Sequence, residues 1–281
     1  SNPVLSTADT GTGGVTCADP FLWIINDALY CFFESTLANE TGQLWMGSSN
    51  DGATWDNFSQ ISTTGTHYAH PSIYEENGVI HCYMQKGNGL IGYRSSPVAG
   101  FPSWSNEIDV FDSVTHGWHH MREFDIFKHS DGNYYLLAVT GDGVSEDQQV
   151  RGLWCSTLTS DWNTDGTPIA VDPLFDCDNE LWVRYIVEIT RLQADGRLLL
   201  YFGATRTYDN TQAIGVYEVA SLTTTGMTGQ WITNNHTFGL SASGWDNTWI
   251  HRMSAIRFNG QWIAAYDANK DNEWKIGFAT R

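Results

Sequence analysis

Three carboxylates, an imidazole and a guanidinium begin five similar segments of this 281-residue chain. They are Asp19, His70, Glu123, Glu188 and Arg252, at spacings of 51, 53, 65 and 64 residues. A buried ring of charges costs free energy unless its members are paired or functional, so these residues are poor choices for core packing. Two carboxyl groups, one protonated and one ionised, can instead do acid–base catalysis, which contributes about 100- to 10,000-fold. The sequence predicts such a site where the five segments meet.

Each of these residues is followed by an apolar strand, a polar turn and a second apolar strand. The first copy runs over residues 19–33, as Asp-Pro-Phe-Leu-Trp-Ile-Ile-Asn-Asp-Ala-Leu-Tyr-Cys-Phe-Phe. The turns fall in register at Asn26-Asp27, Asn77-Gly78, Asp131-Gly132, Asp195-Gly196 and Asn259-Gly260. Asn-Gly and Asp-Gly between strands are strong hairpin signals because both residues tolerate positive φ.

Further strands are expected after each hairpin. Third strands are predicted at 43–49, 90–96, 150–156, 213–219 and 274–280, and fourth strands near 58–62, 107–111, 169–171 and 230–233. Four strands per repeat match the blades of an all-β, five-bladed β-propeller, here one domain over residues 1–281. The fifth copy ends after its third strand, so residues 3–7 are expected to pair onto it and close the ring. The alternative is an irregular β-sandwich.

The amino-acid composition excludes several classes of protein. A net charge of -18 and a pI near 4.6 exclude a nucleic-acid binder that depends on phosphate contacts, and they disfavour an acidic membrane as partner. Aromatic residues make up 14% of the chain, enough for a large core, so disorder is excluded. The five cysteines lack metal-binding spacing and are expected to be small buried hydrophobes. Few lysines and much Asn, Thr and Ser favour a secreted or periplasmic protein; the oligomeric state is left open.

Polar and aromatic residues cluster just before the repeat starts. His67, His119, His120, Arg122, Arg184, Trp249 and His251 are expected at the same mouth of the ring. Arginines there would keep carboxylates ionised and grip hydroxyl groups. Trp118, Trp245 and Trp249 lie in predicted loops and are candidates for stacking on a sugar, while His116 and its neighbours lack zinc spacing. Segment 49–55 resembles an Asp-box turn, for which Asp51 and Trp55 would have structural roles on the outer rim.

The chain resembles the five-bladed propeller glycoside hydrolases of family 43 and their relatives in family 32. Asp19-Pro20 matches the motif whose Asp is the family's catalytic base. Glu123-Phe-Asp-Ile-Phe, followed by Ser130-Asp131-Gly132, matches the third-blade motif whose carboxylate tunes the acid's pKa. Glu188 occupies the place of the general acid. Arg122-Glu123 is similar to the Arg-Asp-Pro of family 32.

The sequence also departs from these motifs. Position 123 is Glu where the family has Asp, Phe124 replaces its Pro, and Ile189-Thr190 replaces the Gly-Pro after the acid. His70 stands where the family has a small residue. Asp125 is a competing third-blade carboxylate, which strand alternation places one step further down the channel.

The resemblance implies a glycosidase acting on a plant, algal or microbial oligo- or polysaccharide, with inversion of configuration. Asp19 would be the base, Glu188 the acid, and Glu123 the residue that raises the acid's pKa. The predicted substrate-binding residues are His70, Arg122, Trp118, His120, Arg184, Trp249, His251 and Arg252. No cofactor is required, although the family often holds a Ca²⁺ or a water at the axis beside a blade-five His, here His251.

Three alternatives remain open at this stage. They are a sugar-binding propeller without catalysis, a degenerate hydrolase, and a glycosidase or lyase that uses a His. Propeller lectins normally repeat one ligand motif in every blade, whereas the five starts here differ chemically, which favours a single asymmetric site.

Overall fold

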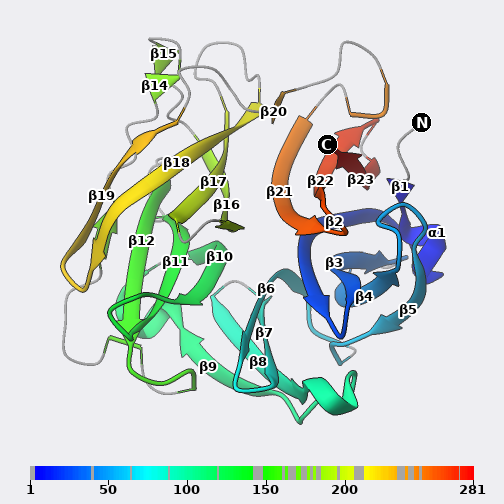
Figure 1. Ribbon diagram of the computed structural model, residues 1–281, viewed down its shortest axis with the longest axis horizontal. Coiled ribbons are helices and arrows are strands. Elements are labelled where there is room, and N and C mark those ends of the chain that lie inside the picture. The colour runs from blue at the N-terminus through cyan, green and yellow to red at the C-terminus, as the bar shows by residue number, and fades with distance from the viewer. Residues whose placement is uncertain are drawn as a thin grey trace.

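A computed structural model of the chain shows five antiparallel blades arranged around a central axis (Figure 1). The first strand of each blade lies innermost, and each of these strands contacts the next around the ring until the fifth meets the first. This is the predicted all-β, five-bladed propeller.

The structure describes the chain apart from residues 1–3, 39–40, 64, 88, 119, 142–147, 160–161, 164–168, 172–175, 178–179, 182–184, 195–196, 206–211, 233–237, 240–243, 247–248 and 272. For a further set it describes the backbone alone: residues 4, 120, 122, 141, 148–149, 169–171, 176–177, 180–181, 185–194, 202–205, 212–215, 231 and 238–239.

The strands follow the predicted order. Blade one holds β2 (Gly13–Ile25), β3 (Ala28–Leu37), β4 (Gly42–Ser49) and β5 (Asp56–Gln60). Blade two holds β6 (Tyr68–Glu76), β7 (Val79–Lys86), β8 (Leu90–Pro97) and β9 (Ile108–Asp112). Blade three holds β10 (His120–Lys128), β11 (Tyr134–Gly141), β12 (Gln148–Cys155) and β13 (Ile169–Val171). Blade four holds β16 (Tyr185–Ala194), β17 (Arg197–Thr205), β18 (Gln212–Thr223) and β19 (Gly226–Trp231). Blade five holds β21 (Trp249–Phe258), β22 (Gln261–Lys270) and β23 (Glu273–Thr280).

Several short strands and helices lie outside the main strands of the blades. They are β1 (Val4–Leu5), α1 (Thr7–Thr10), the 3-10 helices η1 (Val98–Gly100) and η2 (Ser113–His116), the pair β14 (Asp176–Cys177) and β15 (Glu180–Leu181), and β20 (Phe238–Gly239) beside β18. None of the helices in the described part of the chain has the length and apolar character that a membrane span needs.

The ring closes between blades five and one, as predicted. Strand β1 pairs antiparallel with β23, placing Val4 opposite Gly277 and Leu5 opposite Ile276. Leu5 is buried in an apolar cluster that combines residues of blade one with Ile276 and Phe278 of blade five. Closure of this kind covers strand edges that would otherwise be open to pairing with another chain.

Three hairpin turns have the backbone that their sequences predict, whereas at Asp131-Gly132 only Gly132, with φ of 91°, is in the positive-φ region. Asn26 and Asp27 have φ of 50° and 62°, Asn77 and Gly78 of 53° and 73°, and Asn259 and Gly260 of 49° and 82°. Two consecutive residues with positive φ define the tight type I′ turn, whose twist matches that of the flanking strands. The predicted turn at 195–196 lies outside the described residues.

The Asp-box turn is structural, as expected. Asp51 Oδ1 accepts the N–H groups of Ala53 (2.8 Å) and Thr54 (2.7 Å), and these bonds lower the pKa of Asp51 to about 2. Trp55 stacks on Phe278 of blade five with ring centroids 4.4 Å apart. The turn therefore packs blade one against blade five.

The cysteines behave as small hydrophobic residues. Cys17, Cys31, Cys82 and Cys155 are buried. Burial raises the pKa of the first three. The side chain of Cys177 lies outside the described residues.

Truncating the closing strand should destabilise the ring. Leu5→Ala removes a buried side chain from the seam between blades five and one, and it should lower the free energy of unfolding by about 2–4 kcal/mol. Urea unfolding followed by tryptophan fluorescence measures the change. Val15→Ala is the control, because Val15 is exposed and its loss should cost no more than about 0.5 kcal/mol. Equal effects of the two variants would contradict closure by this strand.

Candidate functional site

Three of the predicted site residues share an unusual backbone conformation. Asp19, His70 and Glu123 have φ of 57°, 48° and 44°, in the left-handed region. Each lies where its inner strand shifts register against the second strand of its blade. Left-handed non-glycine residues cost about 1–3 kcal/mol each and collect at functional sites. The equivalent bulges of blades one to three therefore bring these three side chains together at the start of the inner strands, the end of the ring called its mouth below.

The three side chains form a short row of alternating charge type. His70 Nδ1 lies 3.1 Å from Asp19 Oδ2, and His70 Nε2 lies 3.7 Å from Glu123 Oε1. The His70 backbone N–H also donates to Asp19 Oδ2 at 3.2 Å. All three side chains are largely buried. His70, which takes the place of a small residue in the resembled family, thus joins the two carboxylates.

A carboxylate that the sequence reasoning missed holds this row to blade five. Asp267 on β22 accepts the backbone N–H of Asp19 at 3.0 Å and that of Arg252 at 2.6 Å. Both amides lie at register shifts of the strand ladder, so the Asp267 carboxylate bonds backbone where the regular pairing is interrupted. The single acidic residue in the apolar run Ala264–Ala268 was the sequence signal for this role.

Arg252 was expected to contact substrate, and the structure places it elsewhere. The residue is fully buried, its Nη2 donates to the Pro71 carbonyl at 2.8 Å, and its guanidinium lies 5.7 Å from the centre of the Phe21 ring. Because the side chain extends from blade five toward blades one and two, Arg252 is a buried positioning residue.

The charge state of Asp19 follows from these contacts. Burial alone would raise the pKa of Asp19, but the His70 imidazole and its hydrogen bonds, together with the Arg252 guanidinium, hold that pKa well below its usual range. Asp19 is therefore ionised at neutral pH. An ionised carboxylate in a largely buried site can accept a proton from a bound water or hydroxyl group.

An aromatic group lies on the blade-five side of the mouth. His251 packs against Trp274 with ring centroids 4.2 Å apart, and Trp249 stacks near both rings at 6.2–6.5 Å. Trp249 is 40% exposed and so offers a free face. Burial lowers the pKa of His251 to about 4, against the attraction of Asp19, so the imidazole is neutral at pH 7.

The other two predicted stacking tryptophans pack against the fold, Trp118 fully buried and Trp245 half-buried. Trp118 is 2% exposed and packs against Phe111 and His116, because the loop before blade three folds back into the core. Trp245 stacks on Tyr266 and packs over Gly277. Both serve the packing of the fold. Asp125, the competing carboxylate, is fully buried and accepts the Ser72 hydroxyl at 2.5 Å.

Several predicted residues fall outside the described set. They are Arg184 and His119 as whole residues, and the side chains of His120, Arg122 and Glu188. The backbone of Glu188 pairs with Gly203 directly after a register shift at Val187. Among the described residues, no group of three His, Cys, Asp or Glu side chains is placed to hold a metal ion. His251, the family's axial histidine by resemblance, is held by its aromatic neighbours.

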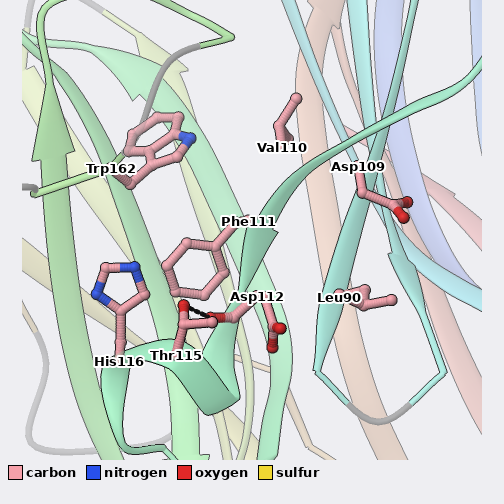
Figure 2. A pocket seen from close by; sticks show the side chains of 8 residues that line it. All are labelled: Leu90, Asp109, Val110, Phe111, Asp112, Thr115, His116 and Trp162. Atoms are coloured by element: carbon pink, nitrogen blue, oxygen red, sulfur yellow. Dashed lines mark hydrogen bonds between the residues drawn. The ribbon is translucent and has the colours of Figure 1, made fainter.

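A separate hollow lies at the outer edge of blade two. It has a volume of about 370 Å³ and is lined by residues of β9 and η2 with Leu90 and Trp162 (Figure 2). Trp162 and His116 lie on one side of it, and Leu90 and Asp109 on the other. The predicted site residues do not line this hollow.

Comparison with known proteins assigns the family. The family described as "Glucosamine inositolphosphorylceramide transferase 1, N-terminal" matches residues 1–269. The chain belongs to this family. Glucosamine inositolphosphorylceramide transferase 1 of Arabidopsis thaliana is 26% identical over 218 residues, and that of Oryza sativa subsp. indica is 24% identical over 212. Each match covers 73% of this chain but only 25–26% of the relative, so the chain spans about a quarter of their length.

Solved structures share the fold across nearly the whole chain. An alpha-L-arabinofuranosidase from Podospora anserina, solved with cellotriose, has a TM-score of 0.72 at 14% identity and covers 99% of this chain and 95% of its own. A GH62 alpha-L-arabinofuranosidase from Coprinopsis cinerea has a TM-score of 0.66 at 15% identity, with 95% and 90% covered. An endo-arabinase from Bacteroides thetaiotaomicron has a TM-score of 0.62 at 15% identity, with 96% and 95% covered. At these identities the likeness establishes the propeller fold alone.

Removing the buried arginine should destabilise the protein in a pH-dependent way. Arg252→Met leaves the Asp19 carboxylate buried without that cation, so unfolding free energy should fall by about 3–5 kcal/mol at pH 7. The loss should be smaller at pH 4.5, because Asp19 can then escape its charge by taking up a proton. Chemical unfolding at the two pH values measures this. Arg257→Met, an exposed position on the same strand, is the control. A pH-independent loss would show that Arg252 acts through packing only.

Proposed function

We propose that this chain is a glycoside hydrolase whose active site is the mouth of the propeller. The observation that carries the proposal is the ionised Asp19 carboxylate, fixed by His70 beside Glu123 on three left-handed bulges. The arrangement is asymmetric, because each blade contributes a different residue. One central site for one sugar fits this better than several equivalent lectin sites do.

The proposed reaction is hydrolysis with inversion. Asp19 takes a proton from a water whose oxygen attacks the anomeric carbon, and Glu188 gives a proton to the departing glycosidic oxygen. In this scheme Glu123 lies near the acid, where its charge raises the pKa of Glu188, and it binds a ring hydroxyl. Inverting enzymes separate the two catalytic carboxyl groups by roughly 6.5–9.5 Å, which leaves room for the water.

The aromatic side of the mouth supports a sugar ligand. A sugar ring has apolar C–H faces that can lie against an exposed indole, and Trp249 offers one. Neutral His251 beside it can hydrogen-bond a hydroxyl without adding charge. A mostly apolar wall with a few polar groups is typical of small-molecule sites. Arabinose-containing glycans, the substrates named for the structural neighbours, are the first class to screen.

A second candidate function follows from the family. The matched relatives are named as transferases, and about three-quarters of their length lies beyond the match. The propeller would then recognise a sugar, such as the glycan of an inositolphosphorylceramide, without cleaving it. In this case the same mouth binds the ligand, and Asp19 accepts a hydroxyl hydrogen bond in place of a proton.

Neutralising the proposed acid or base separates the two functions. Glu188→Gln or Asp19→Asn should reduce turnover of a cleavable glycan by at least about 1,000-fold, because each removes one half of the acid–base pair. Reducing-end release and calorimetry with the same glycan measure hydrolysis and binding. Glu75→Gln and Asp27→Asn, both exposed, are the controls matched in chemistry. Retained turnover in either site variant would refute the hydrolase assignment; binding with no turnover in the wild type would favour the recognition function.

Loss of the exposed indole should weaken ligand binding at either kind of site. Trp249→Ala should lower sugar affinity about tenfold, which corresponds to about 1.4 kcal/mol. Calorimetric titration with the glycan selected above gives the affinity. Ile108→Ala, an exposed apolar residue on blade two, should leave it unchanged. An unchanged affinity for the tryptophan variant would place the sugar elsewhere.

A further inference from the structure

Glu34 is a buried carboxyl group for which the proposed reaction has no role. It lies on β3, opposite Ala18 in the blade-one ladder, and its side chain is 8% exposed. Its carboxyl group is within hydrogen-bond reach of that of Asp19. Two carboxyl groups this close in a buried site cannot both be ionised without a large repulsion. The pair therefore needs one proton.

The surroundings of Glu34 leave room for its side chain and orient a histidine toward it. A Cβ atom at Gly42 would clash with Glu34 Oε1 and come within 2.7 Å of the His67 ring, so both side chains would have to move if Gly42 were replaced. The Gly42 N–H donates to His67 Nδ1 at 3.1 Å. With Nδ1 accepting, the proton of a neutral His67 is on Nε2, which lies 3.8 Å from Glu34 Oε1. The Nε2–H group of His67 therefore points toward Oε1 of Glu34, at a distance longer than a hydrogen bond.

The charges around Glu34 agree with this assignment. Burial, and then the Asp19 carboxylate, raise the pKa of Glu34 well above its usual range, against a smaller opposing effect of His70. Asp267 on β22 also raises the pKa of Glu34, and Cys17 is a titratable neighbour on β2 besides Asp19. Burial and the repulsion from His70 lower the pKa of His67. The contact between His67 and Glu34 is therefore one between neutral groups.

We propose that Glu34 is a protonated carboxylic acid that donates a hydrogen bond to the Asp19 carboxylate and positions it. The proton stays on Glu34, so no net transfer is involved. With His70 on one side and Glu34 on the other, Asp19 keeps its charge and its orientation at the mouth. The effect of Glu34 on catalysis rests on the proposed hydrolase function, but its protonation does not.

Stability as a function of pH tests the protonation directly. Because the folded pKa of Glu34 lies above its unfolded value, the folded protein keeps a proton that the unfolded chain releases, and stability falls as pH rises through that window. Glu34→Gln keeps a donor and an acceptor but cannot ionise. Its Tm relative to wild type should therefore increase between pH 4.5 and pH 8.5, by roughly 3 °C or more.

The control for this experiment makes the same substitution at an exposed carboxyl group. Glu75→Gln, an exposed carboxyl with the same substitution, should show no such pH-dependent gain. If the Tm difference between Glu34→Gln and wild type is the same at both pH values, Glu34 shares the ordinary ionisation of a carboxylate and the proposal is wrong. This measurement needs no substrate, so its outcome is independent of whether the protein hydrolyses a glycan.

Kinetics test the positioning role. With a cleavable glycan, Glu34→Ala should lose at least about tenfold in kcat relative to Glu34→Gln at pH 7, because only the glutamine can still donate to Asp19. Any part of the decline of kcat/KM at high pH that comes from ionisation of Glu34 should disappear in Glu34→Gln, which a purely structural role would not cause, while the part set by the proposed acid Glu188 should remain. Equal kcat values for the two variants would overturn the positioning role. Absence of turnover in the wild type would instead count against the proposed function.

Discussion

The arrangement of side chains at the mouth of this propeller depends on hydrogen bonds from backbone amides to carboxylates, at the points where the inner strands shift register. Where an inner strand shifts register, the regular strand pairing is interrupted, and a buried N–H group there needs another acceptor, because burying it without one costs free energy. Asp267 of blade five accepts the amides of Asp19 and Arg252, and Asp19 accepts that of His70. Carboxylates of one blade therefore complete the backbone of the next. The groups that could do chemistry are also part of what joins the blades.

The same contacts determine which groups of the site are charged. Asp19 accepts hydrogen bonds and lies near a buried guanidinium, so its ionised form is the stable one. His251 is packed among indole rings and is neutral. Neighbouring groups thus differ in protonation because their surroundings differ, and such separation is how acid and base roles arise from similar side chains.

The relatives by sequence and the solved structures with the same fold are named for different chemistries. The relatives by sequence are named as transferases, and several of the solved structures that share the fold are named as hydrolases of arabinose glycans. Both act on sugars, and a propeller can support either because function is determined by the residues at the mouth. The left-handed row of Asp19, His70 and Glu123 is the feature in this chain that any account of its activity must explain.

The sequence by itself determined the architecture, because the information is local and repeated. Turns such as Asn77-Gly78 and the alternation of apolar strands recur with a period close to that of a blade, and this period also brought Asp19, His70 and Glu123 to one mouth. The tertiary structure alone decided which of the polar residues face that mouth. Arg252 extends between blades, and Trp118 turns into the core, because register shifts and loop packing reorient side chains in ways that spacing does not encode. Glu34 and Asp267 lie on second strands, and their roles depend on contacts with Asp19 that only the folded ring creates.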